Sequence, residues 1–211
     1  MRSADAVTLI RVALIVLVAY LIMSKFSPVA IIPLIAVAML LDAVDGYFAV
    51  NESSRGKVGF GTYLRSLAGD QKARGLVKEF REKKSNGSRF GARIDVAGDR
   101  AVEYILWAVY TVVGVLPFFV IVVVIIRHSF VDAVMAAKGT SSKMKTKFAQ
   151  VIYSSNIFRG GINVVKFITF AYLALVYISG YPLWIGYVLV AILVAYIMLR
   201  GAAELYEAYN G

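Results

Sequence analysis

Six apolar segments, each near the roughly 20 residues that a helix needs to cross a bilayer, constrain this chain most strongly. They cover about residues 7–24, 29–50, 94–113, 115–136, 162–180 and 182–202. The stretches SKFSP, GVLP and SGYP join them in pairs, and Gly and Pro there are typical of turns. Hydrophobic residues make up 60% of the chain, against roughly 45–50% in a soluble domain. The pattern predicts an all-α integral membrane protein of six transmembrane helices, a single domain over residues 1–211.

Basic residues fall between the apolar segments. Residues 51–90 carry ten Lys and Arg against four Asp and Glu, and residues 138–161 carry basic residues and no acid. With six spans, both connections and both chain ends lie on one side of the membrane, and the other side has only Lys25. The positive-inside rule makes the basic side cytoplasmic, so we expect a cell-membrane protein. The formal charge of +10 then indicates contact with anionic membrane lipids and no nucleic-acid partner.

Residues 51–90 are predicted to form a basic cytoplasmic insertion in the domain. Apolar residues recur within it at near-helical spacing: Phe60, Tyr63, Leu64, Leu67, Leu76, Val77 and Phe80. Two interpretations remain open. One is an amphipathic segment on the membrane surface, and the other is a solvated loop, which the several glycines favour.

The residue types limit the available chemistry. The chain has no cysteine, which excludes disulfides, thiolate ligands and thiol nucleophiles. Its one histidine, His128, excludes a site built from several histidines. Together with Arg127, His128 is expected to reach toward the inner membrane surface from the fourth span. Catalysis or metal binding must therefore use carboxylates, amines and hydroxyls.

Four carboxylates stand at the edges of two apolar segments. Asp42 and Asp45 are three residues apart, and Asp95 and Asp99 are four apart, so each pair lies on one helical face. The connection between the pairs returns the chain to the same side, which places all four at similar depth. Divalent cations would relieve their repulsion, and oxygen-only ligands favour Mg²⁺, Mn²⁺ or Ca²⁺ over zinc. We therefore expect a metal–diphosphate site in a polar cavity that faces the cytoplasm.

Ion pairing is the alternative for these acids. Charged residues within membrane spans are costly and are functional candidates by default, but an Asp can also be retained as the partner of an Arg. Arg93 and Arg100 are the adjacent candidates.

The residues around the acids resemble a family motif. D42-A-V-D45-G46-Y-F-A49 and G91-A-R-I-D95-V-A-G-D99 are similar to the two halves of the CDP-alcohol phosphotransferase (CDP-alcohol phosphatidyltransferase) motif, and TLIR at residues 8–11 also fits. The stretch SKMKTKFAQ at residues 142–150 resembles the phosphatidylglycerolphosphate synthase branch. The pair Asp99–Arg100 points to the phosphatidylinositolphosphate synthase branch instead.

The chain departs from that motif in two places. Val50 stands where the family has an Arg, and the two halves lie much further apart than usual. Within the insertion, D70-Q-K-A-R74 mimics part of the first half, but Leu67 stands where the partner Asp would be, so we interpret it as a chance match. Arg74 is still a candidate to replace the missing Arg.

The resemblance implies a transferase that moves a phosphate-linked lipid from a CDP-activated donor to an alcohol and releases CMP. Mg²⁺ ions, or Mn²⁺, two in number, would be held by Asp42, Asp45, Asp95 and Asp99, and Asp99 would also act as the general base. The nucleotide would contact Gly46, Ala49, Gly91 and Asp42. Small residues are also common where membrane helices pack, which is the alternative for the two glycines and Ala49.

The acceptor is predicted from basic residues near the inner boundary. Lys143, Lys145, Arg159 and Arg200 favour a phosphorylated polyol such as glycerol phosphate or inositol phosphate. A homodimer is expected by resemblance only. Two other functions stay open: a Mg²⁺-dependent membrane prenyltransferase that uses a prenyl diphosphate, and a non-catalytic cation-binding membrane protein or transporter, which the missing Arg at Val50 favours.

Overall fold

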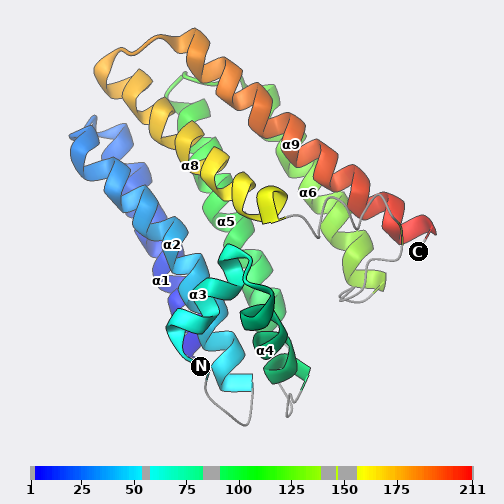
Figure 1. The fold of residues 1–211 in the computed structure, drawn as a ribbon. Coiled ribbons are helices and arrows are strands. Elements are labelled where there is room, and N and C mark those ends of the chain that lie inside the picture. The colour runs from blue at the N-terminus through cyan, green and yellow to red at the C-terminus, as the bar shows by residue number, and fades with distance from the viewer. Residues whose placement is uncertain (1–2, 54–57, 83–90, 139–145, 147–155, 211) are drawn as a thin grey trace.

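The computed structural model describes residues 3–53, 58–82, 91–138, 146 and 156–210. These residues form helices and no strand, which confirms the all-α prediction (Figure 1). The six long helices are α1 (Ser3–Met23), α2 (Pro28–Ser53), α5 (Gly91–Val112), α6 (Phe118–Lys138), α8 (Asn156–Ser179) and α9 (Leu183–Asn210). Two short helices, α3 (Phe60–Ala68) and α4 (Gln71–Glu82), lie in the insertion.

Five of the long helices, α1, α2, α6, α8 and α9, are long and apolar enough to cross a membrane. Large apolar side chains remain exposed on their outer faces, for example Leu9, Phe118 and Trp184, as expected of surfaces that meet lipid. The long helix α5 is not among the five, because its first half carries Asp95 and Asp99 together with basic residues. A membrane protein is therefore indicated, and the sixth span stays a prediction.

The long helices pack side by side around one apolar core (Figure 1). Helix α1 packs against both α2 and α5, α8 against α2 and α9, and α6 against α5 and α9. Gly114 and Gly180 take positive φ angles at the turns after α5 and α8, a conformation that L side chains rarely adopt. The turns therefore fall where the sequence predicts them.

The insertion contains a helical hairpin, α3–α4. Gly69 ends α3 in the left-handed conformation and donates its backbone N–H to Arg65 O, and Asp70 Oδ1 accepts the backbone N–H groups of Lys72 and Ala73 at the start of α4. The helical interpretation is thus confirmed for residues 60–82, while its position on the membrane surface stays a prediction.

The hairpin packs against the end of α2. The cluster consists of Val50, Val58, Tyr63 and Val77, with Tyr47 and Phe80 against it. Asn51 fixes the connection, since its side chain accepts the N–H of Val58 at 2.7 Å and donates to the carbonyl of Val58 at 3.2 Å.

Ionic contacts connect the helices within the bundle. Arg100 on α5 donates two hydrogen bonds to Asp132 on α6, at 2.7 and 2.8 Å. Arg127 on α6 is buried and donates to the carbonyl of Ile197 and to Glu204 on α9, both at 3.0 Å. His128 is also buried. The prediction that Arg127 and His128 reach the membrane surface is therefore wrong, because partners on neighbouring helices hold or surround them inside the bundle.

We predict that Gly201→Ala destabilises the protein. A Cβ at Gly201 would lie 2.5 Å from Nε of Arg127, so the guanidinium would have to leave the carbonyl of Ile197 and the carboxylate of Glu204. The free energy of unfolding should fall by about 1–3 kcal/mol, seen as a lower thermal unfolding midpoint. Gly75→Ala is the matched control, because nothing lies within 4 Å of its added Cβ. Equal midpoints for the two variants would contradict the prediction.

Candidate active site

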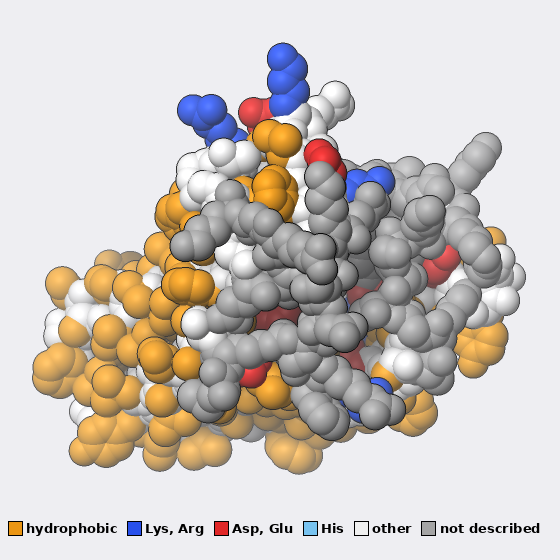
Figure 2. Space-filling model, turned by 90° about the horizontal axis from the view of Figure 1, so that it is seen from below, with side chains coloured by type: hydrophobic (Ala, Val, Ile, Leu, Met, Phe, Trp, Pro, Cys, Tyr) orange, Lys and Arg blue, Asp and Glu red, His pale blue; other side chains and the backbone are white. Residues whose placement is uncertain are grey.

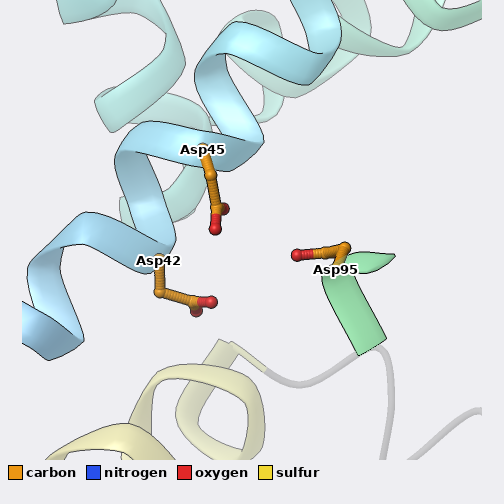
Figure 3. A group of neighbouring side chains, drawn as sticks. All are labelled: Asp42, Asp45 and Asp95. Atoms are coloured by element: carbon orange, nitrogen blue, oxygen red, sulfur yellow. The ribbon is translucent and has the colours of Figure 1, made fainter. Parts of the chain in front are cut away.

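Three of the four acids lie together. Carboxylate oxygens of Asp42 and Asp45 on α2 and of Asp95 on α5 all lie within 4.8 Å of one another. Their side chains point toward one another, with the first turns of α8 nearby (Figure 3). Seen from below, acidic side chains lie deep in the middle of this end of the molecule, and hydrophobic side chains cover its flanks (Figure 2). The i, i+3 spacing on α2 thus brings both carboxylates to the face that meets the start of α5.

Asp99 lies one turn further along α5 and outside this group of three. Its side chain is partly exposed, and its Oδ1 accepts a hydrogen bond from Nη2 of Arg11. Asp99 therefore stands at the margin of the cluster, where a second molecule has access to it.

Arg11 on α1 is the main residue that sequence reasoning missed. Its side chain is 3% exposed, and Nη1 donates to Asp42 Oδ1 at 2.5 Å and to Asp45 Oδ2 at 3.3 Å. Nη2 donates to Asp99, so one guanidinium connects both acid pairs. The sequence stretch TLIR contains this residue, but its role could be seen only when α1 was placed against α2 and α5.

Thr8, one turn before Arg11, completes this face of α1. Its Oγ1 lies 3.3 Å from Asp45 Oδ2 and also donates to the carbonyl of Ala4 at 3.2 Å. Its methyl group presses on Gly98 of α5, where a Cβ would collide with it. Gly98 therefore lets α1 approach α5 closely enough for Arg11 to reach Asp99.

Some of the acids are ion-paired, but their partner is neither Arg93 nor Arg100. Arg100 is engaged with Asp132, and the partner of the acids is Arg11. Among the described side chains, one guanidinium against four carboxylates leaves a formal excess of three negative charges. Such an excess in a half-buried site favours a bound cation.

The donor set fits a hard divalent cation. All three donors are carboxylate oxygens close enough to share one ion, and oxygen-only donor sets favour cations such as Mg²⁺ or Mn²⁺ over zinc. Asp45 is buried and Asp95 is exposed, so the set is open on one side. A second molecule can therefore supply further oxygen ligands.

The residues expected to contact a nucleotide are only partly described. Gly46 lies on α2 one turn after Asp42, and the hydroxyl of Tyr63 lies directly against it. Ala49 follows on the same helix and Gly91 is the first residue of α5, but the side chain of Ala49 lies outside the described atoms.

Among the residues expected to bind the acceptor, Lys143 and Lys145 lie outside the described residues. Arg159 is in the first turn of α8, and its side chain is not described. Arg200 on α9 is partly exposed, with Nε 3.4 Å from Glu204 Oε1. The structure thus places one of the four basic side chains.

Arg74 lies within the hairpin. Its Nε donates to the carbonyl of Ser66 at 3.0 Å, and Val50, the residue at the position of the family Arg, is buried in the cluster between α2 and the hairpin. Within the described part of the chain, the guanidinium that meets the acids is that of Arg11.

Another buried carboxylate, Glu103, lies one turn beyond Asp99. It accepts Lys166 Nζ of α8 at 2.6 Å and the indole N–H of Trp107 at 3.4 Å, and His128 Nε2 is 4.0 Å away. Glu103 therefore connects α5 to α6 and α8 and is satisfied without contact to the acid cluster.

The model of the CDP-alcohol phosphatidyltransferase family matches residues 1–59. The matched part contains Thr8, Arg11, Asp42 and Asp45, and it ends immediately before α3 begins at Phe60. The match supports this family, and with it a membrane-associated transferase of phospholipid synthesis that acts on phosphate groups. Members generally depend on a divalent metal. No curated protein and no solved structure matches the chain.

We predict that Asp45→Asn weakens divalent-cation binding. Loss of even an outer partner of a metal ligand costs about 10–100-fold in affinity, so loss of a buried ligand should cost at least as much. Mn²⁺ binding followed by electron paramagnetic resonance measures the change. Asp70→Asn is the control, because the amide oxygen can still cap α4 and Asp70 lies in the hairpin. Unchanged Mn²⁺ affinity in Asp45→Asn would count against the metal site.

We predict that Arg11→Gln makes the fold depend on a divalent cation. Removing the guanidinium leaves Asp42, Asp45 and Asp99 without their partner, and breaking a buried pair costs about 3–5 kcal/mol. Thermal unfolding should therefore show a large loss in EDTA and partial recovery in Mg²⁺, because a ligand that binds only the folded state stabilises it. The gain from Mg²⁺ should exceed that of the wild type. Equal gains in the two proteins would show that Arg11 and the cation do not share the same acids.

Proposed function

We propose that this protein is a CDP-alcohol phosphotransferase that moves a phosphate-linked lipid from a CDP-activated donor to an alcohol and releases CMP. The observation that carries the proposal is the convergence of Asp42, Asp45 and Asp95, with Asp99 one turn away. The match of the family model to residues 1–59 supports it, because both aspartates of the first motif half lie within the matched part.

Asp42, Asp45 and Asp95, with Asp99, would hold two Mg²⁺ or Mn²⁺ ions. When bound, such ions neutralise the donor diphosphate and stabilise the departing CMP. Arg11 contributes a fixed positive charge from the α1 side and holds Asp42, Asp45 and Asp99 in position. By the resemblance, the nucleotide of the donor would approach the backbone at Gly46, Ala49 and Gly91.

Asp99 is the general base in this proposal. The acceptor hydroxyl oxygen forms a bond to the phosphorus that carries the lipid, the bond from that phosphorus to the bridging oxygen breaks, and CMP leaves with that oxygen. The hydroxyl proton passes to the carboxylate of Asp99, which is partly exposed and oriented by Arg11 through Oδ1.

A phosphorylated polyol, such as glycerol phosphate or inositol phosphate, is the proposed acceptor. Thr146, the described residue of the Lys-x-Lys-Thr stretch, donates its backbone N–H and its hydroxyl to Glu207 Oε2 of α9, at 2.9 and 2.6 Å. Arg200 lies about two turns earlier on α9. Thr146 therefore connects this stretch to α9. In this proposal the basic residues Lys143, Lys145, Arg159 and Arg200 bind the phosphate of the acceptor.

The orientation in the membrane is inferred from the sequence, and the oligomeric state is inferred from the resemblance. The basic connections support an active site that faces the cytoplasm of the cell membrane. A homodimer is proposed from the resemblance alone. The family match favours a phosphotransferase over a prenyltransferase or a cation-binding transporter.

Asp99→Asn tests the proposal. With Mg²⁺, a CDP-linked lipid and a panel of glycerol phosphate, inositol phosphate and serine, the wild type should release CMP with one of the phosphorylated acceptors. Asn cannot accept the proton, so turnover should fall by about 10²–10⁴-fold, while CMP binding measured by calorimetry stays substantial. Asp70→Asn should keep wild-type turnover. Normal turnover in Asp99→Asn would remove the general-base role, and no CMP release by the wild type with any acceptor would remove the proposed reaction.

A further inference from the structure

The hairpin α3–α4 stands between the two halves of the acid motif. The match to the family model ends at residue 59, and α3 begins at Phe60. Asp42 and Asp45 precede the hairpin and Asp95 follows it, yet their carboxylates meet. The hairpin is therefore an addition placed next to the site in both sequence and space.

Tyr63 of α3 is held firmly at the α2 side of the hairpin. Its side chain is 4% exposed and packs with Val50, Val58 and Val77, and its ring centroid lies 5.7 Å from that of Tyr47. The hydroxyl of Ser66 donates to the carbonyl of Tyr63 at 2.6 Å. These contacts fix where the phenol points.

The phenol points at the face of α2 that carries the acids. Gly46 lies four residues after Asp42, so the two positions share one face of the helix. The hydroxyl of Tyr63 contacts Gly46 so closely that a Cβ at this position would collide with it. A polar group from the hairpin therefore stands one helical turn from the carboxylate of Asp42.

Two further observations connect this contact with the donor site. Helix α3 also packs against α8, whose first turns pass beside the acids (Figure 3). Val50, at the position of the family Arg, is buried in the same cluster as Tyr63. The hairpin thus covers the part of α2 from which that Arg is missing, and it brings a hydroxyl there instead.

We propose that the hairpin α3–α4 forms one wall of the donor site and that Tyr63 is a residue that binds the CMP portion of the donor. Its hydroxyl donates a hydrogen bond to the ribose or phosphate oxygens of the CMP portion. A nucleotide whose diphosphate is held at Asp42 and Asp45 and which approaches Gly46 meets this hydroxyl. The inference rests on the proposed function, because it takes the cluster as the diphosphate site.

Tyr63→Phe tests the inference by keeping the packed ring and removing the hydroxyl. CMP binding in Mg²⁺, measured by calorimetry on the full-length protein, should weaken about tenfold, the value of one hydrogen bond. The KM for the acceptor should stay at the wild-type value. Tyr47→Phe is the matched control from the same aromatic cluster, and it should keep wild-type CMP affinity.

A second variant uses the contact itself. Gly46→Ala should weaken CMP binding, because the new Cβ displaces Tyr63. In Gly46→Ala/Tyr63→Phe the collision is gone, so the double variant should lose less CMP affinity than the two single losses combined. Losses that instead multiply would show that the two residues act independently and would overturn the coupling.

The outcomes separate the inference from the proposed function. Wild-type CMP affinity in Tyr63→Phe, with CMP bound normally by the wild type, would overturn the role of Tyr63 and leave the transferase proposal standing. Absence of Mg²⁺-dependent CMP binding by the wild type would overturn both.

Discussion

The guanidinium of Arg11 among the carboxylates is the interaction on which the arrangement of this end of the molecule depends. Four acids gathered in an apolar bundle repel one another, and burial raises the cost of each charge. Arg11 offsets part of that repulsion by binding Asp42, Asp45 and Asp99 at once. Thr8 packs on Gly98, and this contact lets α1 lie close to α5, which carries Asp99. The convergence of the two acid pairs is therefore a property of three helices.

Helix α5 carries charged residues along its length, and these residues connect it to the neighbouring helices. Its acids Asp95 and Asp99 face α1 and α2, Arg100 binds Asp132 on α6, and Glu103 binds Lys166 on α8. Helices α1, α6 and α8 thus each supply a partner for a charge that would be costly in lipid. The same charges lower its hydropathy, which is why five helices and not six stand out as apolar spans. The charges that obscure α5 as a span are those that connect it to the bundle.

Local patterns in the sequence predicted the helices and the faces that carry the acids. The segment expected at 29–50 is α2 (Pro28–Ser53), and the one at 94–113 is α5 (Gly91–Val112). Helical spacing alone places Asp42 and Asp45 on one face. The role of Arg11 could not be predicted, because its partners lie 31 to 88 residues away.

Long-range contacts also explain the prediction that failed. The prediction that Arg127 reaches the membrane surface considered this residue without its partners. Its partners are Glu204 and the carbonyl of Ile197 on α9, 70 or more residues away in the sequence. The long insertion between the two halves of the motif does not prevent their carboxylates from meeting. Each doubling of a flexible connection costs only about 0.6 kcal/mol, and helices hold the acids together. Because the helices and not the connection hold the acids together, the connection can form a structure of its own, which here is the hairpin α3–α4. Here the hairpin lies against Gly46 and buries Val50, which stands where the family has an Arg. On these two contacts we base the proposal that the hairpin supplies part of the donor site.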